Sequence, residues 1–261
     1  MVIYMERLIL IDGSNMLFRM CFGMPSILNR SKKEVKGVYG FVASIFKLAK
    51  EFSTDKFIVC FDTETSISNN KELNEDYKSN RPDYSQLPEN ENPFVQLNYI
   101  IEALKKLNIP TIQCVDNEAD DYLASIAKKY EDSYNVIIVS SDKDLLQIVS
   151  DNIQVYNAQA KILYTKEKIK EKFNVDVEQY ILYKALVGDN SDNIKGIKGV
   201  GPKTAVKLIN DRTSSVWSEY ASLIETNLKI MTLNCTLCTN INIHPYTKYY
   251  KTWDVLNLII D

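Results

Sequence analysis

The stretch LILIDGSN at residues 8–15 decides the fold of this 261-residue chain, because four apolar residues run directly into an aspartate and a tight turn. The same arrangement recurs in FIVCFDTE at residues 57–64 and in VIIVSSDKD at residues 136–144. Short apolar runs rich in β-branched residues and bounded by turn residues are typical of buried parallel strands. We therefore expect an α/β fold with an acid near the carboxyl end of each strand.

Nine carboxylates fall in five short clusters along the chain. Four of the clusters follow an apolar run, the fourth run being residues 112–115, and the fifth lies in GDNSDN at residues 188–193. The nine acids are Asp12, Asp62, Glu118, Asp120, Asp121, Asp142, Asp144, Asp189 and Asp192. Ligand crevices of open α/β sheets lie at the carboxyl ends of the strands, so these acids should converge there. A pocket of this kind needs cations, and its hard oxygen ligands suit Mg²⁺ or Mn²⁺.

Each cluster also has an ordinary structural explanation. Asp12 before Gly13 suits a turn, and acids at residues 118–121 suit the first turn of a helix. Asp142 and Asp144 follow two serines and suit a helix cap, and GDNSDN has the composition of a loop. The five clusters together favour metal ligands over these separate explanations. Two-metal hydrolysis needs several carboxylates and no histidine, and the only histidine here is His244 in the tail.

Strand patterns alternate with helical patterns up to about residue 165, as in βαβ units on a parallel sheet. Apolar residues at helical spacing predict helices at residues 37–52, 94–107 and 120–130. Beyond residue 165 the strand pattern fades, and helices are expected at residues 166–173, at residues 177–186 and from Lys203 onward. We expect a core domain at residues 1–175 and a helical DNA-binding region with a C-terminal tail at residues 176–261.

The segment at residues 63–93 is polar and has no sustained apolar face. A connection of this length is usually a functional lid or disordered. Residues 64–92 carry three basic and seven acidic side chains. A net charge of −4 is poor for gripping a single strand of nucleic acid.

Four of the eight glycines fall between residues 188 and 201, and GVGPK at residues 199–203 predicts a tight turn that opens a helix. Backbone amides at a helix N-terminus bind phosphates, although a plain connecting turn is the alternative. The candidate contacts to a polyanion are Lys195, Lys198, Gly199, Val200, Gly201, Lys203, Thr204 and Lys207, with Lys32 and Lys33 in a second basic cluster.

Composition narrows the class of protein. The net charge of −3 argues against a simple duplex binder, but neutralising the nine clustered acids would leave a net charge of +6. No apolar stretch approaches the roughly 20 residues that span a bilayer, and the N-terminus lacks the features of a signal peptide. A cytoplasmic protein is expected. Cys235 and Cys238 lack the further ligands of a structural zinc site, so two ordinary thiols are the better interpretation.

Four motifs in this order resemble the 5′-nuclease superfamily: IDGSN, EADD, SSDKDLLQIV and GDNSDNIKGIKGVGPKTA. The chain is similar in particular to bacterial and bacteriophage flap endonucleases and to the 5′-nuclease domain of DNA polymerase I. The resemblance extends from Leu8 to about Leu208. It implies a PIN-like core with a mostly parallel central sheet, a helical arch at about residues 63–93 and a helix–three-turn–helix region.

The resemblance also implies roles for individual residues. It places Asp12, Asp62, Glu118 and Asp120 in a first metal group, Asp144, Asp189 and Asp192 in a second, and Asp121 and Asp142 near or between them. It implies that residues 199–201 grip duplex phosphates and hold a K⁺ ion. Tyr77, Lys78 and Arg81 match the basic arch motif that contacts the scissile phosphate, with a solvated loop as the alternative. The residues expected to act in catalysis are Asp12, Asp62, Lys78, Arg81, Asp120 and Asp142.

The function implied is a structure-specific 5′ nuclease that uses two Mg²⁺ ions, for which Mn²⁺ substitutes, near the 5′ end of branched or nicked DNA. The expected partners are such DNA and RNA–DNA primer hybrids, and the expected state is a monomer. A non-catalytic branched-DNA binding module of the same fold stays open as an alternative. A PIN-type ribonuclease is a further alternative, although such domains usually carry fewer acids and lack the glycine–lysine turn.

Overall fold

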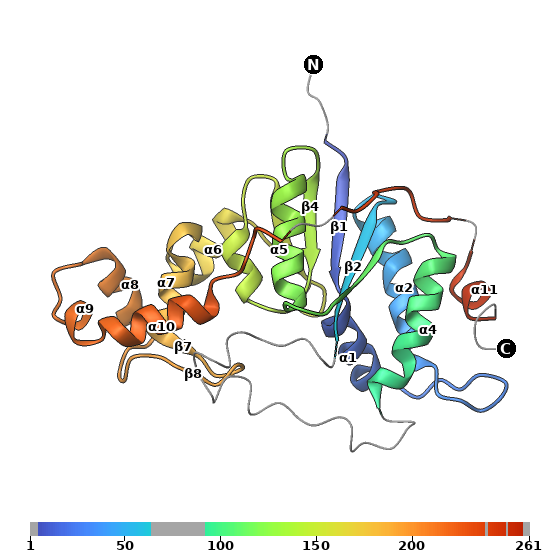
Figure 1. Ribbon diagram of the computed structural model, residues 1–261, viewed down its shortest axis with the longest axis horizontal. Coiled ribbons are helices and arrows are strands. Elements are labelled where there is room, and N and C mark those ends of the chain that lie inside the picture. Colours follow the sequence, from blue (N-terminus) through green and yellow to red (C-terminus); the bar gives the residue numbers. More distant parts are fainter. Residues whose placement is uncertain (1–4, 64–91, 238–239, 249, 258–261) are drawn as a thin grey trace.

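A six-stranded sheet forms the centre of the computed structural model, which describes residues 5–63, 92–237, 240–248 and 250–257 (Figure 1). The strands are β1 (Arg7–Asp12), β2 (Phe57–Asp62), β3 (Thr111–Cys114), β4 (Asn135–Val139), β5 (Ile153–Asn157) and β6 (Ile162–Tyr164). Their order is β3-β2-β1-β4-β5-β6; neighbours from β3 to β5 pair in parallel, and β6 runs antiparallel to β5. The expected α/β fold with a mostly parallel sheet is confirmed.

Strands β2 and β3 lie on one side of β1, and β4 to β6 lie on the other, so the strand order reverses at β1. In open α/β sheets the ligand crevice forms at such a point, outside the carboxyl ends of the strands. Asp12 ends β1, and the residues after β4 begin at Ser140. The topology therefore brings two of the predicted acidic clusters to the place where a binding site is expected.

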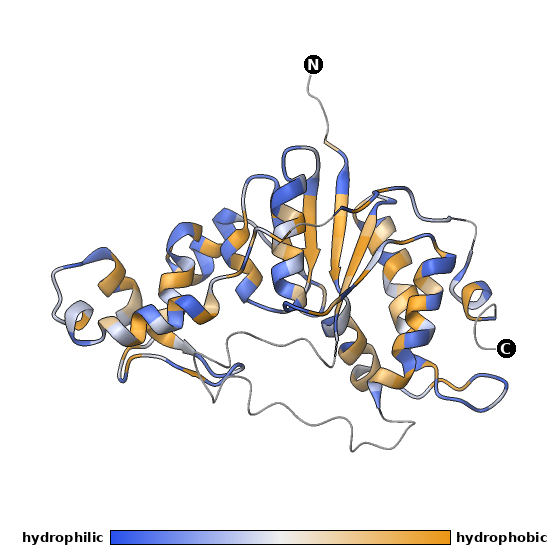
Figure 2. Ribbon diagram, viewed as in Figure 1, coloured by the Kyte–Doolittle hydropathy of each residue, from blue (hydrophilic) through white to orange (hydrophobic). Residues whose placement is uncertain are grey.

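Alternate residues of the strands feed two separate cores, because successive side chains of a strand point to opposite faces. Leu8 and Leu10 of β1 pack into one core, whereas Ile9 and Ile11 pack into the other. All four side chains are fully buried. The strands accordingly form a continuous apolar layer between two layers of helices (Figure 2).

The helices on the two faces begin and end close to the expected residues. Helices α1 (Gly13–Gly23), α2 (Lys36–Glu51) and α4 (Pro93–Lys106) contribute to the core on one face, and α5 (Ala119–Tyr130) to the core on the other. The bounds of α2, α4 and α5 lie within one residue of the sequence expectation. Helix α1 was not expected, because its opening residues Gly, Ser and Asn favour a turn; the Asp12 carboxylate caps it by accepting from the Asn15 amide at 2.9 Å.

A helical region extends from the sheet on the α5 side (Figure 1). It contains α6 (Lys166–Phe173), α7 (Val177–Val187), α8 (Pro202–Asn210), α9 (Val216–Glu219) and α10 (Ala221–Met231). Between α7 and α8 lies a small hairpin of β7 (Gly188–Asp189) and β8 (Ile194–Lys195). A short 3₁₀ helix, η2 (Asp144–Ile148), packs against α7 and joins this region to the core.

The chain after α10 returns to the core through residues 232–237 and 240–248, which we call the C-terminal strap (Figure 1). The Tyr130 hydroxyl at the end of α5 donates to the Ile241 carbonyl at 2.9 Å, and the Tyr246 amide donates to the Asp55 carbonyl at 2.8 Å. The strap leads to α11 (Thr252–Asn257), which packs on α2 and α4. The tail is therefore a structural part of the molecule. None of the described helices is long and apolar enough to cross a membrane.

Candidate metal centre and nucleic-acid interface

Asp12 is the buried acid at the centre of the carboxyl edge of the sheet, only 6% exposed. The Ser140 hydroxyl donates to its Oδ2 at 2.7 Å, so β1 and the end of β4 are joined at this point. Burial, followed by repulsion from Asp62, raises the pKa of Asp12 to about 7; Asp142 adds to the repulsion. Acids from three neighbouring strands therefore affect one another electrostatically, as the sequence predicted.

The other acids expected in the first metal group lie around the start of α5. The Asp62 Oδ1 accepts a hydrogen bond of 2.8 Å from the Ala119 amide, the first residue of that helix. Glu118 is the N-cap residue of α5, and its side chain makes no capping hydrogen bond. Asp120 lies in the first turn and is partly buried. A helix N-terminus favours negative charge, which offsets part of the repulsion among these acids.

Asp121, the neighbour of Asp120, makes a contact that the sequence did not predict. Its Oδ1 accepts a hydrogen bond of 2.8 Å from the Asn234 amide of the C-terminal strap. One oxygen of this carboxylate is therefore engaged in holding the strap on α5.

The acids expected in the second metal group lie where η2, α7 and the β7–β8 hairpin meet. Asp144 opens η2 and is 8% exposed, and Asp189 ends β7. Asp192 is also buried and lies in the hairpin loop. Asp142 precedes η2, and its Oδ1 accepts from the Asp144 amide at 2.7 Å.

Asp142 also connects the two groups electrostatically. It adds to the repulsion at Asp12, and with Asp189 it contributes to the raised pKa of the buried Tyr180 hydroxyl, for which burial is the main cause. Asp142 therefore acts electrostatically both on Asp12 of β1 and on Tyr180 of α7.

A lysine that the sequence analysis missed holds the second group together. Lys184 of α7 is 5% exposed, and its Nζ forms ion pairs with Asp144 and, at 2.6 Å, with Asp189 Oδ2. Burial opposes ionisation of Asp189, but the Lys184 ammonium and the Ser191 donors outweigh it and lower the pKa of Asp189 to about 2. The available signal was a single lysine in the otherwise apolar stretch YILYKALV, five residues before Asp189.

The donor set fits divalent cations by its chemistry, since it consists of carboxylate oxygens. Within the described ranges, however, no three acidic, histidine or cysteine side chains are arranged to hold a metal ion in this conformation. Asp12, Asp62, Asp142 and Asp189 all accept hydrogen bonds from protein donors, and each carboxylate keeps further lone pairs that could bind an ion.

The predicted phosphate-binding turn forms at the start of α8. Gly199 has φ +82°, a conformation that favours glycine, and a side chain there would meet open space. Gly201 is the N-cap of α8 and Pro202 its first residue, so no side chain caps the helix. The predicted contact residues Lys195, Lys198, Lys203, Thr204 and Lys207 are all exposed around this turn, with Val200 partly buried. The turn therefore presents backbone amides and cations to solvent together.

The remaining predicted contacts lie elsewhere. Lys32 and Lys33 are exposed in the loop between α1 and α2, on the other side of the sheet from the α8 turn. Tyr77, Lys78 and Arg81, and the arch expected around them, lie outside the described residues, as does Cys238. Cys235 is a free, partly buried thiol.

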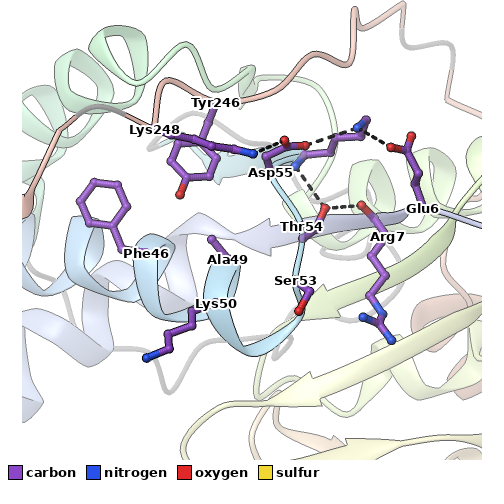
Figure 3. A pocket seen from close by; sticks show the side chains of 11 residues that line it. Glu6, Arg7, Phe46, Ala49, Lys50, Ser53, Thr54, Asp55, Tyr246 and Lys248 are labelled. Carbon is purple, nitrogen blue, oxygen red and sulfur yellow. Dashed lines mark hydrogen bonds and ion pairs between the residues drawn. The ribbon is translucent and has the colours of Figure 1, made fainter.

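A sizeable pocket occurs at the opposite edge of the sheet (Figure 3). It has a volume of about 480 Å³ and is lined by residues that precede β1 and β2, including Glu6, Thr54 and Asp55, together with Tyr246 and Lys248 of the strap. Its charged groups largely satisfy one another, since Lys56 and Lys248 both form ion pairs with Asp55. This pocket lies at the amino ends of the strands and is separate from the acidic site.

Two family models match consecutive parts of the chain. The one described as "5'-3' exonuclease, N-terminal resolvase-like domain" matches residues 7–174, and the one described as "5'-3' exonuclease, C-terminal SAM fold" matches residues 175–232. The chain belongs to the 5′-3′ exonuclease family. Residues 233–261, which include most of the C-terminal strap, lie beyond both matches.

Relatives with known names agree with this assignment. A 5′-3′ exonuclease from Aquifex aeolicus is 37% identical over 207 residues, which cover 78% of this chain and 69% of the relative. A DNA polymerase I from Caldicellulosiruptor bescii is 35% identical over 215 residues, which cover 80% of this chain but only 25% of the polymerase. The chain thus corresponds to a small part of the polymerase and to most of the separate exonuclease.

Solved structures of bacteriophage T5 proteins have the same fold. The T5 5′-exonuclease with bound zinc ions superposes with a TM-score of 0.72 at 29% identity, covering 88% of this chain and 90% of the T5 chain. The T5 D15 flap endonuclease in a pseudo-enzyme–product complex with DNA and metal ions gives a TM-score of 0.73 at 27% identity, with the same coverage. The family and these neighbours identify the chain as a structure-specific 5′ nuclease.

Proposed function

We propose that this 5′ nuclease hydrolyses phosphodiesters near the 5′ end of branched or nicked DNA by a two-metal-ion mechanism, in replication or repair steps such as primer or flap removal. The observation that supports the proposal is that Asp62 and Asp142 act electrostatically on Asp12 at the carboxyl edge of the sheet, while Lys184 links Asp144 to Asp189. The chain is a divalent-metal-dependent enzyme, and we propose Mg²⁺ as the ion, with Mn²⁺ able to substitute.

Two bound divalent ions supply activation of a water molecule and stabilisation of the leaving oxygen. In this proposal Asp12, Asp62, Glu118 and Asp120 hold the first ion, while Asp144, Asp189 and Asp192 hold the second. Asp142 lies between the groups and orients Asp144 through the backbone amide. Ser140 fixes the direction of the Asp12 carboxylate. We assign Asp121 to the edge of the site, because the strap engages one of its oxygens.

We assign binding of the DNA substrate to the α8 turn. Its uncapped helix N-terminus and the exposed side chains of Lys198, Lys203 and Lys207 suit the phosphates of a duplex. We propose that carbonyls of residues 199–201 hold a K⁺ ion there. Tyr77, Lys78 and Arg81 are proposed to contact the scissile phosphate, where positive charge stabilises the transition state.

We also propose that the chain acts as a monomer in the cytoplasm and that RNA–DNA primer hybrids are among its substrates. The division into a nuclease core at residues 1–175 and a helical region at residues 176–261 is likewise a proposal. Its support is that α7 to α10, which all begin after residue 176, form one group of packed helices attached to the core through η2.

A cleavage panel tests the proposed activity. Flap, nicked, gapped and RNA-primed duplexes, labelled at the 5′ end, are incubated with the protein in Mg²⁺ and in chelator. We expect short labelled products from the branched and nicked DNA in Mg²⁺ and none in chelator. Cleavage confined to RNA would instead favour a PIN-type ribonuclease, and tight binding without cleavage would favour a non-catalytic module.

A further inference from the structure

Lys184 is the one lysine or arginine classed as buried in the part of the chain that the structure describes. It lies one turn before the end of α7, among apolar neighbours such as Tyr183, Ala185 and Leu186. A buried ammonium is costly unless it is paired, because burial removes its hydration. The position of Lys184 therefore requires an explanation.

The partners of Lys184 supply that explanation. Its Nζ forms ion pairs with Asp144 of η2 and Asp189 of β7, two acids that different elements bring to the same place. These two acids are members of the second metal group. A single ammonium therefore occupies the space between the carboxylates that are proposed to share the second ion.

An ammonium and a divalent ion compete for the same carboxylate oxygens. When Lys184 is paired with Asp144 and Asp189, an oxygen of each carboxylate is engaged and half of their formal charge is neutralised. A divalent ion that enters this group must first displace the ammonium. The hydrogen-bond donors to Asp12 and Asp62 in the described residues are neutral, namely the Asn15 and Ala119 amides and the Ser140 hydroxyl. The partly buried Arg19 guanidinium interacts with Asp12 electrostatically.

We propose that Lys184 is a built-in cation that fills the second metal group of the metal-free enzyme, holds Asp144 and Asp189 in place, and competes with the second divalent ion. Lys184 is a positioning residue in this account. The inference rests on the proposed assignment of the metal groups. It predicts sequential loading, in which the group around Asp12 takes its ion at lower concentration than the group around Asp144.

Calorimetric titration of the full chain with Mn²⁺ alone, without DNA, tests the proposal. Wild type, Lys184→Met and Lys184→Arg are compared with Lys229→Met, which removes an exposed lysine paired with Glu225 on α10. We expect the wild type to bind one ion tightly and a second more weakly. Lys184→Met should strengthen the weaker site about tenfold and leave the tighter site unchanged. In Lys184→Arg the weaker site should bind Mn²⁺ no more tightly than it does in the wild type. Lys229→Met should bind both ions with wild-type affinity.

Thermal unfolding in chelator and in Mn²⁺ provides the second readout. Lys184→Met should unfold at a lower temperature than the wild type in chelator, because the buried Asp144 and the partly buried Asp189 lose their counter-charge, and Mn²⁺ should raise its midpoint by more than it raises that of the wild type. If Lys184→Met does not fold, the Arg variant decides: a stronger second site in that variant contradicts competition. If the wild type and the Lys184 variants bind two Mn²⁺ ions with the same affinities, the proposed role of Lys184 is wrong and the proposed function is unaffected. If the wild type binds no Mn²⁺, the proposed function itself is wrong.

Discussion

The carboxyl of Asp12 shows how one residue couples the metal site to stability. Its pKa in the folded protein is about 7, well above the value near 3.9 of an unfolded chain, because it is buried and close to Asp62. Between these two values the folded state binds a proton that the unfolded state does not. The stability of the metal-free protein should therefore fall as the pH rises from about 4 to about 7.

Asp12→Asn should remove that dependence. The amide keeps an acceptor for the Asn15 amide, and the Ser140 hydroxyl can turn to accept from the new NH₂ group. In chelator at pH 8 we expect the variant to exceed the wild type in free energy of unfolding by on the order of 2 kcal/mol, with no gain at pH 4. Urea unfolding across this pH range measures it, with the exposed Asp132→Asn as control. A steep pH dependence retained by Asp12→Asn would contradict the assignment.

The glycine turn before α8 gives a prediction at the scale of one element. Gly199→Ala should destabilise the protein by about 1–2 kcal/mol, because a positive φ strains an L-residue while the side chain itself meets open space. Gly201→Ala is the matched control, since Gly201 has φ −93° and an equally open surrounding, and its loss should be smaller. Urea unfolding of the two variants compares them, and equal losses would show that the backbone conformation is not the cause.

Helix α8 itself is predicted to contact phosphates. Replacing Lys203 and Lys207 by alanine should weaken DNA binding in chelator and reduce the slope of log affinity against log salt by about 2, roughly one unit per lost phosphate contact. Fluorescence anisotropy over a range of KCl concentrations measures both quantities. Alanine at Lys168 and Lys229, which pair with acids on α6 and α10, should leave the slope unchanged. An unchanged slope in the α8 variant would place the duplex elsewhere.

Elements with a strong pattern were predictable from the sequence, and those defined by tertiary contacts were not. The apolar runs that became β1, β2 and β4 carry their own signal, as does the amphipathic α2. Helix α1 was missed because its start depends on the Asp12 side chain as a cap. At the site, the acids were recognisable by their motifs. Lys184 was not, since its importance depends on Asp144 and Asp189 approaching it from other elements.

The C-terminal strap joins the whole molecule. Gln147 of η2, three residues after Asp144, donates to the Met231 carbonyl at the end of α10 and accepts from the Leu233 amide of the strap, at 2.9 and 3.1 Å. The same strap reaches α5 through Asp121 and continues to α11. The acidic site thus lies between the core and a helical region that the strap holds together.

Gln147→Ala should destabilise the protein by about 1–3 kcal/mol, because it leaves a carbonyl and an amide at the strap without their partner. Gln159, which is exposed in the turn after β5, is the control, and Gln159→Ala should change the free energy of unfolding by less than about 0.5 kcal/mol. Chemical denaturation of both variants measures the difference. Equal stability of the two variants would show that the Gln147 contacts do not tie the strap to the core.

Cleavage of a 5′-labelled flap duplex in Mg²⁺ by the double variant Asp120→Asn, Asp142→Asn tests the central claim most directly. Asp120 belongs to the first acidic group and Asp142 lies between the two groups, so replacing both carboxylates by side-chain amides should weaken ion binding at both positions. The α8 turn should still bind DNA. We expect the cleavage rate to fall by at least about a hundredfold, with flap binding in chelator retained. Cleavage at the wild-type rate would contradict the claim that these converging acids form the catalytic metal centre.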